Sequence, residues 1–147
     1  MFKTILVPTD GSDLSEKAVQ GAIELAKLTG GRIIAVSVAE PYPYQYTALS
    51  QGGVPLDHNL YEKQMQKYAQ MHVDKISETA AKAGVPCTAH VAQSLSPHQG
   101  IIDAANEHHC DVIVMASHGR TGLNKLFLGS ETQKVLAHSA IPVMVFR

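Results

Sequence analysis

Residues 112–122 read Val-Ile-Val-Met-Ala-Ser-His-Gly-Arg-Thr-Gly, and residues 128–133 read Leu-Gly-Ser-Glu-Thr-Gln. The first part is a β-branched apolar run that ends in small residues, which is typical of a buried strand in a parallel sheet. A loop then leads to a Gly-Ser pair at the start of a predicted helix. Small residues let backbone N–H groups approach a phosphate, and a helix N-terminus adds unpaired donors and a favourable dipole. The stretch therefore predicts a nucleotide-binding α/β protein.

The rest of the chain continues this alternation of strands and helices. Strands are predicted over about residues 2–9, 32–38, 85–91, 111–116 and 141–146, and helices over about residues 13–29 and 57–83 and from residues 96 and 130 onward. The apolar side of the second helix is expected to carry Leu60, Met65, Tyr68, Met71 and Ile76. Right-handed crossovers then predict one doubly wound, Rossmann-like parallel sheet of five strands in the order 3-2-1-4-5, with helices on both faces. No linker or repeat divides the chain, so one domain is expected over residues 1–147.

The predicted strand order also locates a binding site. Ligands of doubly wound sheets bind beyond the carboxyl ends of the strands, where the winding direction reverses. The ends of the first and fourth strands should lie side by side, so Thr9 and Asp10 would face residues 115–119 across a crevice. The connection over residues 119–128 is longer than the roughly two to six residues of most such loops, which favours a ligand loop over a surface insertion. It is not a Walker motif, because no Gly-Lys-Ser/Thr follows the glycines.

Composition excludes several classes of protein. Twelve basic and thirteen acidic residues among 147 give a net charge of −1, with no basic block, which argues against a nucleic-acid partner. The apolar run at residues 2–8 is too short for a signal peptide or a membrane span. Cys87 and Cys110 show no CxxC spacing and predict no disulfide framework. We therefore expect a cytoplasmic protein without a nucleic-acid or membrane partner.

The triplet His108-His109-Cys110 invites a metal-site interpretation. Adjacent histidines at a helix end point in different directions, and no third ligand follows at helical or strand spacing. A polar helix terminus, where cations are favourable near the negative end of the dipole, is the expected role. The sequence therefore predicts no protein-held metal site.

The glycine spacing resembles the nucleotide loop of the ATP-binding branch of the universal stress protein (UspA-like) family, which is written G-x2-G-x9-G-S/T. Gly119, nine intervening residues and Gly129-Ser130 match its second part, while Ala116 stands at its first glycine and adds one methyl group where the backbone nears a phosphate. The resemblance extends along the whole chain. Its other segments are Val7-Pro8-Thr9-Asp10-Gly11-Ser12, Val36-Ser37-Val38 and Ile141-Pro142-Val143-Met144-Val145.

The resemblance implies an ATP site, with Mg²⁺ or Mn²⁺ as the accompanying ion. The implied adenosine-binding residues are Pro8, Thr9, Asp10, Val38 and Met115, with Asp10 accepting hydrogen bonds and Met115 contacting the base. The implied phosphate-binding residues are Ala116, Ser117, His118, Gly119, Arg120, Gly129, Ser130 and Glu131.

Two of these residues have competing local roles. Asp10 could be a turn residue whose side chain accepts from the N–H of Ser12 or Asp13. Ser130 is predicted to cap the fourth helix in a capping box with Gln133, so capping and phosphate binding would compete for one hydroxyl group.

The last strand, over about residues 141–146, is apolar on both sides and is expected at a sheet edge, where an uncovered strand invites association. The resemblance implies a homodimer through this strand, with Ile141, Val143 and Val145 at the interface.

Three functions remain open at this point. The first is an ATP-binding regulatory protein of the stress response, as the resemblance implies. The second is a slow ATPase, for which no water-positioning Glu or Gln paired with a metal-binding carboxylate is evident, although Asp10, His118 and Glu131 could contribute. The third is a nucleotide-free dimeric scaffold, which is favoured if Ala116 blocks the approach of a phosphate.

Overall fold

The computed structural model of the chain describes residues 1–42, 57–119 and 128–147. Its elements are, in order, β1 (Thr4–Pro8), α1 (Asp13–Thr29), β2 (Arg32–Ala39), α2 (His58–Lys82), β3 (Cys87–Gln93), α3 (Pro97–Glu107), β4 (Val112–Ala116), α4 (Ser130–His138) and β5 (Val143–Phe146). The five strands form one sheet in the order β3-β2-β1-β4-β5, and every pair is parallel. The predicted fold class and strand order are confirmed.

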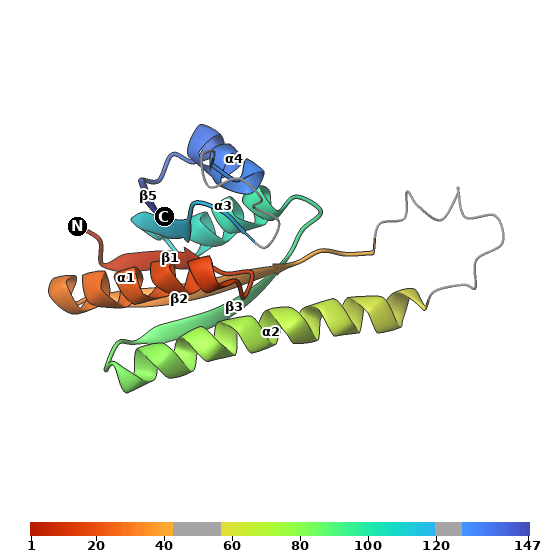
Figure 1. Cartoon of the computed structure of the whole chain (residues 1–147), viewed down its shortest axis with the longest axis horizontal. Helices are drawn as coiled ribbons and strands as arrows, with labels where there is room; N and C mark the ends of the chain where they lie inside the picture. The colour runs from red at the N-terminus through yellow and green to blue at the C-terminus, as the bar shows by residue number, and fades with distance from the viewer. Residues whose placement is uncertain (43–56, 120–127) are drawn as a thin grey trace.

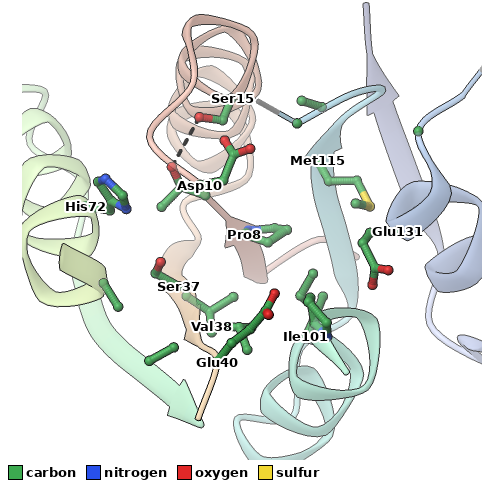
Figure 2. A pocket seen from close by; sticks show the side chains of 18 of the residues that line it. Pro8, Asp10, Ser15, Ser37, Val38, Glu40, His72, Ile101, Met115 and Glu131 are labelled. Atoms are coloured by element: carbon green, nitrogen blue, oxygen red, sulfur yellow. Dashed lines mark hydrogen bonds between the residues drawn. The ribbon is translucent and has the colours of Figure 1, made fainter. Parts of the chain in front are cut away.

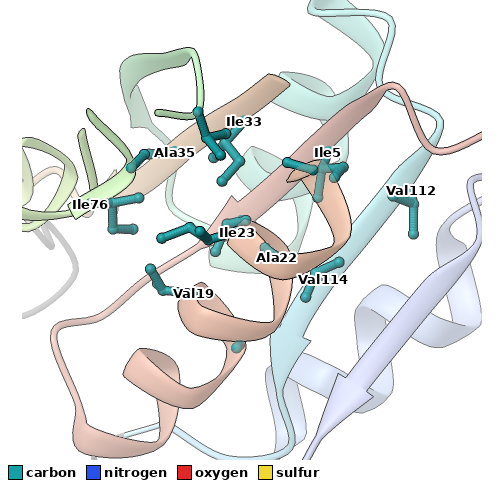
Figure 3. Close-up of a cluster of buried hydrophobic side chains, with 14 of the residues drawn as sticks. Ile5, Val19, Ala22, Ile23, Ile33, Ala35, Ile76, Val112 and Val114 are labelled. Atoms are coloured by element: carbon teal, nitrogen blue, oxygen red, sulfur yellow. The ribbon is translucent and has the colours of Figure 1, made fainter. Parts of the chain in front are cut away.

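The sheet separates two hydrophobic layers. On one face, α1 and α2 pack over the inward side chains of β1, β2 and β4, as the side chains around Ile5, Ala22 and Ile76 show in Figure 3. On the other face, α3 and α4 cover a second cluster that contains Leu6 and Ile113. Figure 1 shows α3 and α4 on the side of the sheet opposite to α2. Because the central strands are buried on both faces, their sequences are continuous apolar runs.

The apolar side predicted for α2 is wrong in part. Leu60, Tyr68 and Met71 are 64%, 47% and 55% exposed, whereas the predicted Ile76 is buried together with Ala69, Val73 and Ala80. In Figure 1 the N-terminal half of α2 extends past the ends of the strands, so large side chains there have no sheet to cover. Small and β-branched residues form the stripe that packs on the sheet.

The ends of the elements follow local hydrogen bonding. Asp57 caps α2 by accepting from the N–H groups of Asn59 and Leu60, and Gly84 follows the helix at φ 73°, a left-handed conformation that favours glycine. β3 begins at Cys87, two residues later than predicted. Val85 is held in the turn by its N–H bond to the Ala80 carbonyl group, 2.9 Å.

Two findings bear on the excluded classes. None of the helices in the described ranges combines the length and the apolar character needed to cross a bilayer. Cys87 and Cys110 are both free thiols. Burial, followed by the neighbouring Asp111 carboxylate, raises the pKa of Cys110 to about 11.

Candidate functional site

A cavity of about 700 Å³ opens at the carboxyl ends of β1, β2 and β4, where the strand order reverses. This volume lies within the range of roughly 300–1,000 Å³ that is usual for small-molecule sites. Figure 2 shows His72 of α2 on one side of the cavity and Met115 and Glu131 on the other. The predicted site residues that line it are Pro8, Thr9, Asp10, Val38, Met115, Ala116, His118, Gly119, Gly129, Ser130 and Glu131. Arg120 lies outside the described residues.

Ser117 does not line this cavity among the described residues, although it lies between two residues that do. It is 1% exposed, its N–H donates to the Phe146 carbonyl group at 2.7 Å, and its carbonyl group accepts from the Gly129 N–H at 2.7 Å. Ser117 therefore joins the end of β4 both to β5 and to the start of α4. Its place in the structure is behind the cavity wall.

Asp10 sits in the turn that follows β1. Its Oδ1 atom accepts from the Ser12 N–H at 2.9 Å, which is the local turn role that the sequence offered as an alternative. Thr9 Oγ1 accepts from the Gly11 N–H at 3.1 Å and lies 3.2 Å from Ser15 Oγ, the contact drawn in Figure 2. These bonds fix the Asp10 side chain at the edge of the cavity.

Gly119 allows the chain leaving β4 to pass this carboxylate. A β-carbon at position 119 would lie 2.6 Å from Asp10 Oδ2, closer than real β-carbons approach other atoms. A β-carbon at Gly129 would lie 3.2 Å from the Ser117 carbonyl oxygen and 3.3 Å from His118 Cα. Gly119 therefore stands where the backbone passes closely by a side chain, and Gly129 stands where two backbone segments pass each other closely.

The predicted capping box at the start of α4 is wrong. The residue at the N-cap is Gly129, in an extended conformation, and Ser130 is the first helical residue. The Gln133 side chain donates to the Leu128 carbonyl group at 2.6 Å instead of reaching back to the cap. The Ser130 hydroxyl group is therefore not needed for capping, and the expected competition between its two roles does not arise.

The first turn of α4 presents backbone donors to the cavity. The first bond of the helix runs from the Gln133 N–H to the Gly129 carbonyl group at 3.0 Å, so the N–H groups of Ser130, Glu131 and Thr132 have no acceptor inside the helix. All three residues line the cavity. The Gly129 N–H is already bonded to Ser117, so Gly129 contributes its lack of a side chain. A helix start of this kind attracts an anion.

His118 brings a buried polar atom to the cavity. Its Nδ1 atom lies 2.9 Å from Ser117 Oγ, and its Nε2 atom is buried without a hydrogen-bond partner in the described part of the chain. An unsatisfied buried donor or acceptor costs roughly 1–3 kcal/mol. A ligand oxygen within reach of Nε2 would remove that cost.

Glu131 links α4 to α3. Ser96, at the N-cap of α3, makes no side-chain capping bond. Glu131 Oε2 accepts from the His98 N–H at 2.8 Å and lies 3.1 Å from His98 Nδ1, while Oε1 accepts from Lys134 Nζ at 3.0 Å. Partial burial alone would raise the pKa of Glu131, but the bonds from Lys134 and His98 outweigh it and lower this pKa.

Glu131→Gln is expected to lower the free energy of unfolding at pH 7 by about 0.5–1 kcal/mol, because the cap of α3 loses its charge. The lowered pKa means that the contribution of the charge is present above about pH 4.5, the ordinary value for Glu, and is lost as the pH falls through the folded-state pKa. Urea denaturation at pH 7 and pH 3 measures both effects. The control is Glu78→Gln on the exposed side of α2. An equal loss at both pH values would contradict this role.

One wall of the cavity was not predicted from the sequence. Five lining residues come from α2. Thr132 of α4 lines the cavity as well; it is 3% exposed and donates from Oγ1 to the Ala116 carbonyl group at 3.0 Å. The α2 residues are Tyr61, Met65, Tyr68, Ala69 and His72. Their helical spacing was the available signal, but Met65 and Tyr68 were predicted only as part of the apolar side of the helix and not as the wall of a cavity.

Known proteins resemble this chain over its whole length. A sequence profile described as the Universal stress protein family matches residues 1–147. A universal stress protein of Thermus aquaticus is 33% identical over 147 residues, with 100% of both chains covered. The solved structure of the protein MJ0577 of Methanocaldococcus jannaschii superposes with a TM-score of 0.82 at 26% identity, covering 99% of this chain and 96% of that one.

Two more distant structures with the same fold were solved as nucleotide complexes. One universal stress protein, in complex with cAMP, has a TM-score of 0.71 at 22% identity and covers 99% of this chain and 97% of its own. A universal stress protein from Archaeoglobus fulgidus, in complex with dAMP, has a TM-score of 0.68 at 22% identity, with 100% of both chains covered.

Proposed function

The chain belongs to the universal stress protein family, and from this membership and the geometry of the crevice we propose that it binds an adenine nucleotide between β1, β4 and α4. The observation that carries the proposal is the cavity of about 700 Å³, in which N–H groups of a helix start that have no acceptor within α4 meet a largely apolar wall. The two relatives solved with cAMP and dAMP support an adenine nucleotide as the class of ligand.

The adenosine half of the proposed site lies at the ends of β1 and β2. Pro8 and Val38 offer apolar surface, and Met115 offers a polarisable thioether to the face of the base. Asp10, at the edge of the cavity, is the proposed acceptor for adenosine. Its bond to Ser12 keeps the carboxylate oriented without help from the ligand.

The phosphate half lies at the first turn of α4. The N–H groups of Ser130, Glu131 and Thr132 are the proposed donors, joined by the Ser130 hydroxyl group and His118 Nε2. Within the described part of the chain, the lining has the carboxylates of Asp10, Glu40 and Glu131 and no Lys or Arg. A divalent cation would offset the repulsion between these groups and a polyphosphate, so ATP with Mg²⁺ or Mn²⁺ is the proposed ligand.

Binding and regulation fit this site better than turnover. Hydrolysis needs a group that orients a water molecule in line with the leaving phosphate. Glu131 is held by His98 and Lys134, and Asp10 Oδ1 is held by Ser12, so neither carboxylate is placed for that task. We therefore assign the chain a regulatory role in the stress response. Its cytoplasmic location stays a prediction from the sequence.

The proposed assembly is a homodimer through β5, an edge strand of the sheet. The Pro142 and Phe146 carbonyl groups accept from the N–H groups of Ile113 and Ser117 in and beside β4. Peptide groups alternate in direction along a strand, so the N–H and C=O groups of Val143 and Val145 point toward the open edge of the sheet. These groups and the side chain of Ile141 are the proposed contacts with a second copy.

Calorimetric titration with ATP and with inorganic triphosphate tests the site. Asp10→Ala is expected to weaken ATP binding about tenfold, or about 1.4 kcal/mol, because a charged acceptor for adenosine is lost. Triphosphate affinity should stay within about twofold, since the first turn of α4 is untouched. Native mass spectrometry of the freshly purified chain would report a bound nucleotide directly.

Asp10→Asn is the matched control, because its amide oxygen can still accept from Ser12 and keep the turn. Comparing Asp10→Asn with Asp10→Ala separates the effect of losing the charge from the effect of losing the turn. Equal losses for ATP and triphosphate in Asp10→Ala would refute the adenosine role. An absence of ATP binding by the parent chain would refute the proposed function itself.

A further inference from the structure

A cluster of metal-ligating side chains lies at the C-terminal end of α3, the end opposite to Pro97, which lines the crevice. His108 Nε2 and His90 Nδ1 are 3.0 Å apart, with their rings nearly perpendicular at 88°. A carboxylate oxygen of Glu107 joins them, and the three ligand atoms all lie within 4.8 Å of one another. Both histidines are half-buried and Glu107 is exposed.

The fold brings these residues together from distant parts of the chain. His90 lies on the edge strand β3, two residues before Ala92, which packs in the core cluster beneath α3 and α4. Side chains two residues apart on a strand share a face, so His90 lies on the side of the sheet that α3 covers. Glu107 ends α3 and His108 is its C-cap. His109 adopts φ 51°, which turns the chain away after the cluster.

We propose that His90, Glu107 and His108 bind a divalent late transition metal of the zinc class. Two imidazole nitrogens and one carboxylate oxygen are a common protein ligand set for Zn²⁺, with one position left for water. Nitrogens bound to one tetrahedral zinc ion at about 2.0–2.1 Å lie about 3.3–3.4 Å apart. The observed 3.0 Å between the histidine nitrogens needs only a small opening to reach that separation.

The surroundings of the cluster favour a cation. The cluster lies at the C-terminal end of α3, where the helix dipole has its negative end. The exposed Glu107 side chain gives the ion a route from solvent and a charge to neutralise. Without a metal, one imidazole N–H donates to the other ring. On binding, that ring must carry its proton on its other nitrogen, so that both facing nitrogens bind the ion.

The test is calorimetric titration of the full, untagged chain with ZnCl₂. We expect one ion per chain, with His90→Ala and His108→Ala each weakening the affinity at least tenfold. Glu107→Gln, at an exposed position, should weaken the affinity several-fold. His109→Asn is the matched control: it removes the adjacent histidine, and asparagine tolerates the positive φ. MgCl₂ should give no comparable heat, because Mg²⁺ prefers oxygen ligands.

NMR spectroscopy gives a second readout that does not depend on the heat of binding. Long-range ¹H–¹⁵N spectra of the imidazole rings should show the Nδ1 resonance of His90 and the Nε2 resonance of His108 shifting together on addition of ZnCl₂. Thermal unfolding without zinc confirms that each variant is folded. The proposal is overturned if the parent chain does not bind Zn²⁺ below millimolar concentration, or if His90→Ala and Glu107→Gln bind it as the parent does.

Discussion

Gly119→Val is expected to weaken ATP binding at least 100-fold, or about 2.7 kcal/mol, while the chain stays folded. The first side-chain atom at this position would lie 2.6 Å from Asp10 Oδ2. The Asp10 carboxylate is held by Ser12 and cannot move aside without breaking that turn. The backbone at position 119 must then shift, which separates the proposed adenosine and phosphate halves of the site. Calorimetry measures the affinity, and circular dichroism checks the fold.

Two further variants make this test specific. Gly119→Ala carries the same clash without the branched methyl groups and should show a smaller loss. Gly84→Asn lies after α2 in open space at φ 73°, a conformation that asparagine accepts, and should bind ATP like the parent chain. Unchanged affinity in Gly119→Val would refute the proposed use of this loop.

Val145→Pro is expected to convert the proposed dimer to a monomer. The Val145 N–H points to the open edge of β5, whereas the neighbouring peptide groups bond β4. Proline therefore removes a donor that a second copy would use and leaves the hydrogen bonds between β4 and β5 intact. Edge strands accept proline at positions of this kind, where the N–H group faces away from the sheet. Sedimentation velocity at several protein concentrations measures the change.

The matched control is Val145→Ala, which loses a comparable part of the side chain but keeps the N–H group. It should remain a dimer, with somewhat faster dissociation. A dimeric Val145→Pro, or a parent chain that is monomeric at every concentration, would show that β5 is not the interface.

The fold was predictable because its determinants are local and repetitive. Buried apolar runs alternate with helical patterns, and the handedness of crossovers leaves few strand orders. Boundaries depended on finer interactions: the bond from Val85 to Ala80 holds Val85 in the turn before β3. The apolar side of α2 was misjudged because the pattern cannot show that the N-terminal half of this helix extends past the strands, where a large side chain such as Leu60 stays exposed.

The site was predictable where glycine spacing carries the signal and hidden where partners are distant in sequence. Gly119 and Gly129 could be placed from their pattern, but the bond from Glu131 to His98 spans 33 residues. The pair His90 and His108 is 18 residues apart and joins a strand to a helix end, so spacing predicted no third ligand there. The prediction of Ser130 as the N-cap was wrong because Gly129 takes the extended backbone conformation that an N-cap requires.

The bonds of Glu131 have a consequence for ligand size. One carboxylate fastens the opening turns of α3 and α4 to each other, so these helices cannot part without breaking it. The width of the part of the crevice that α3 and α4 line is thereby set by the protein before a ligand binds. A ligand too large for this crevice must break the bond between Glu131 and His98, whereas a ligand that fits binds to a preorganised pocket.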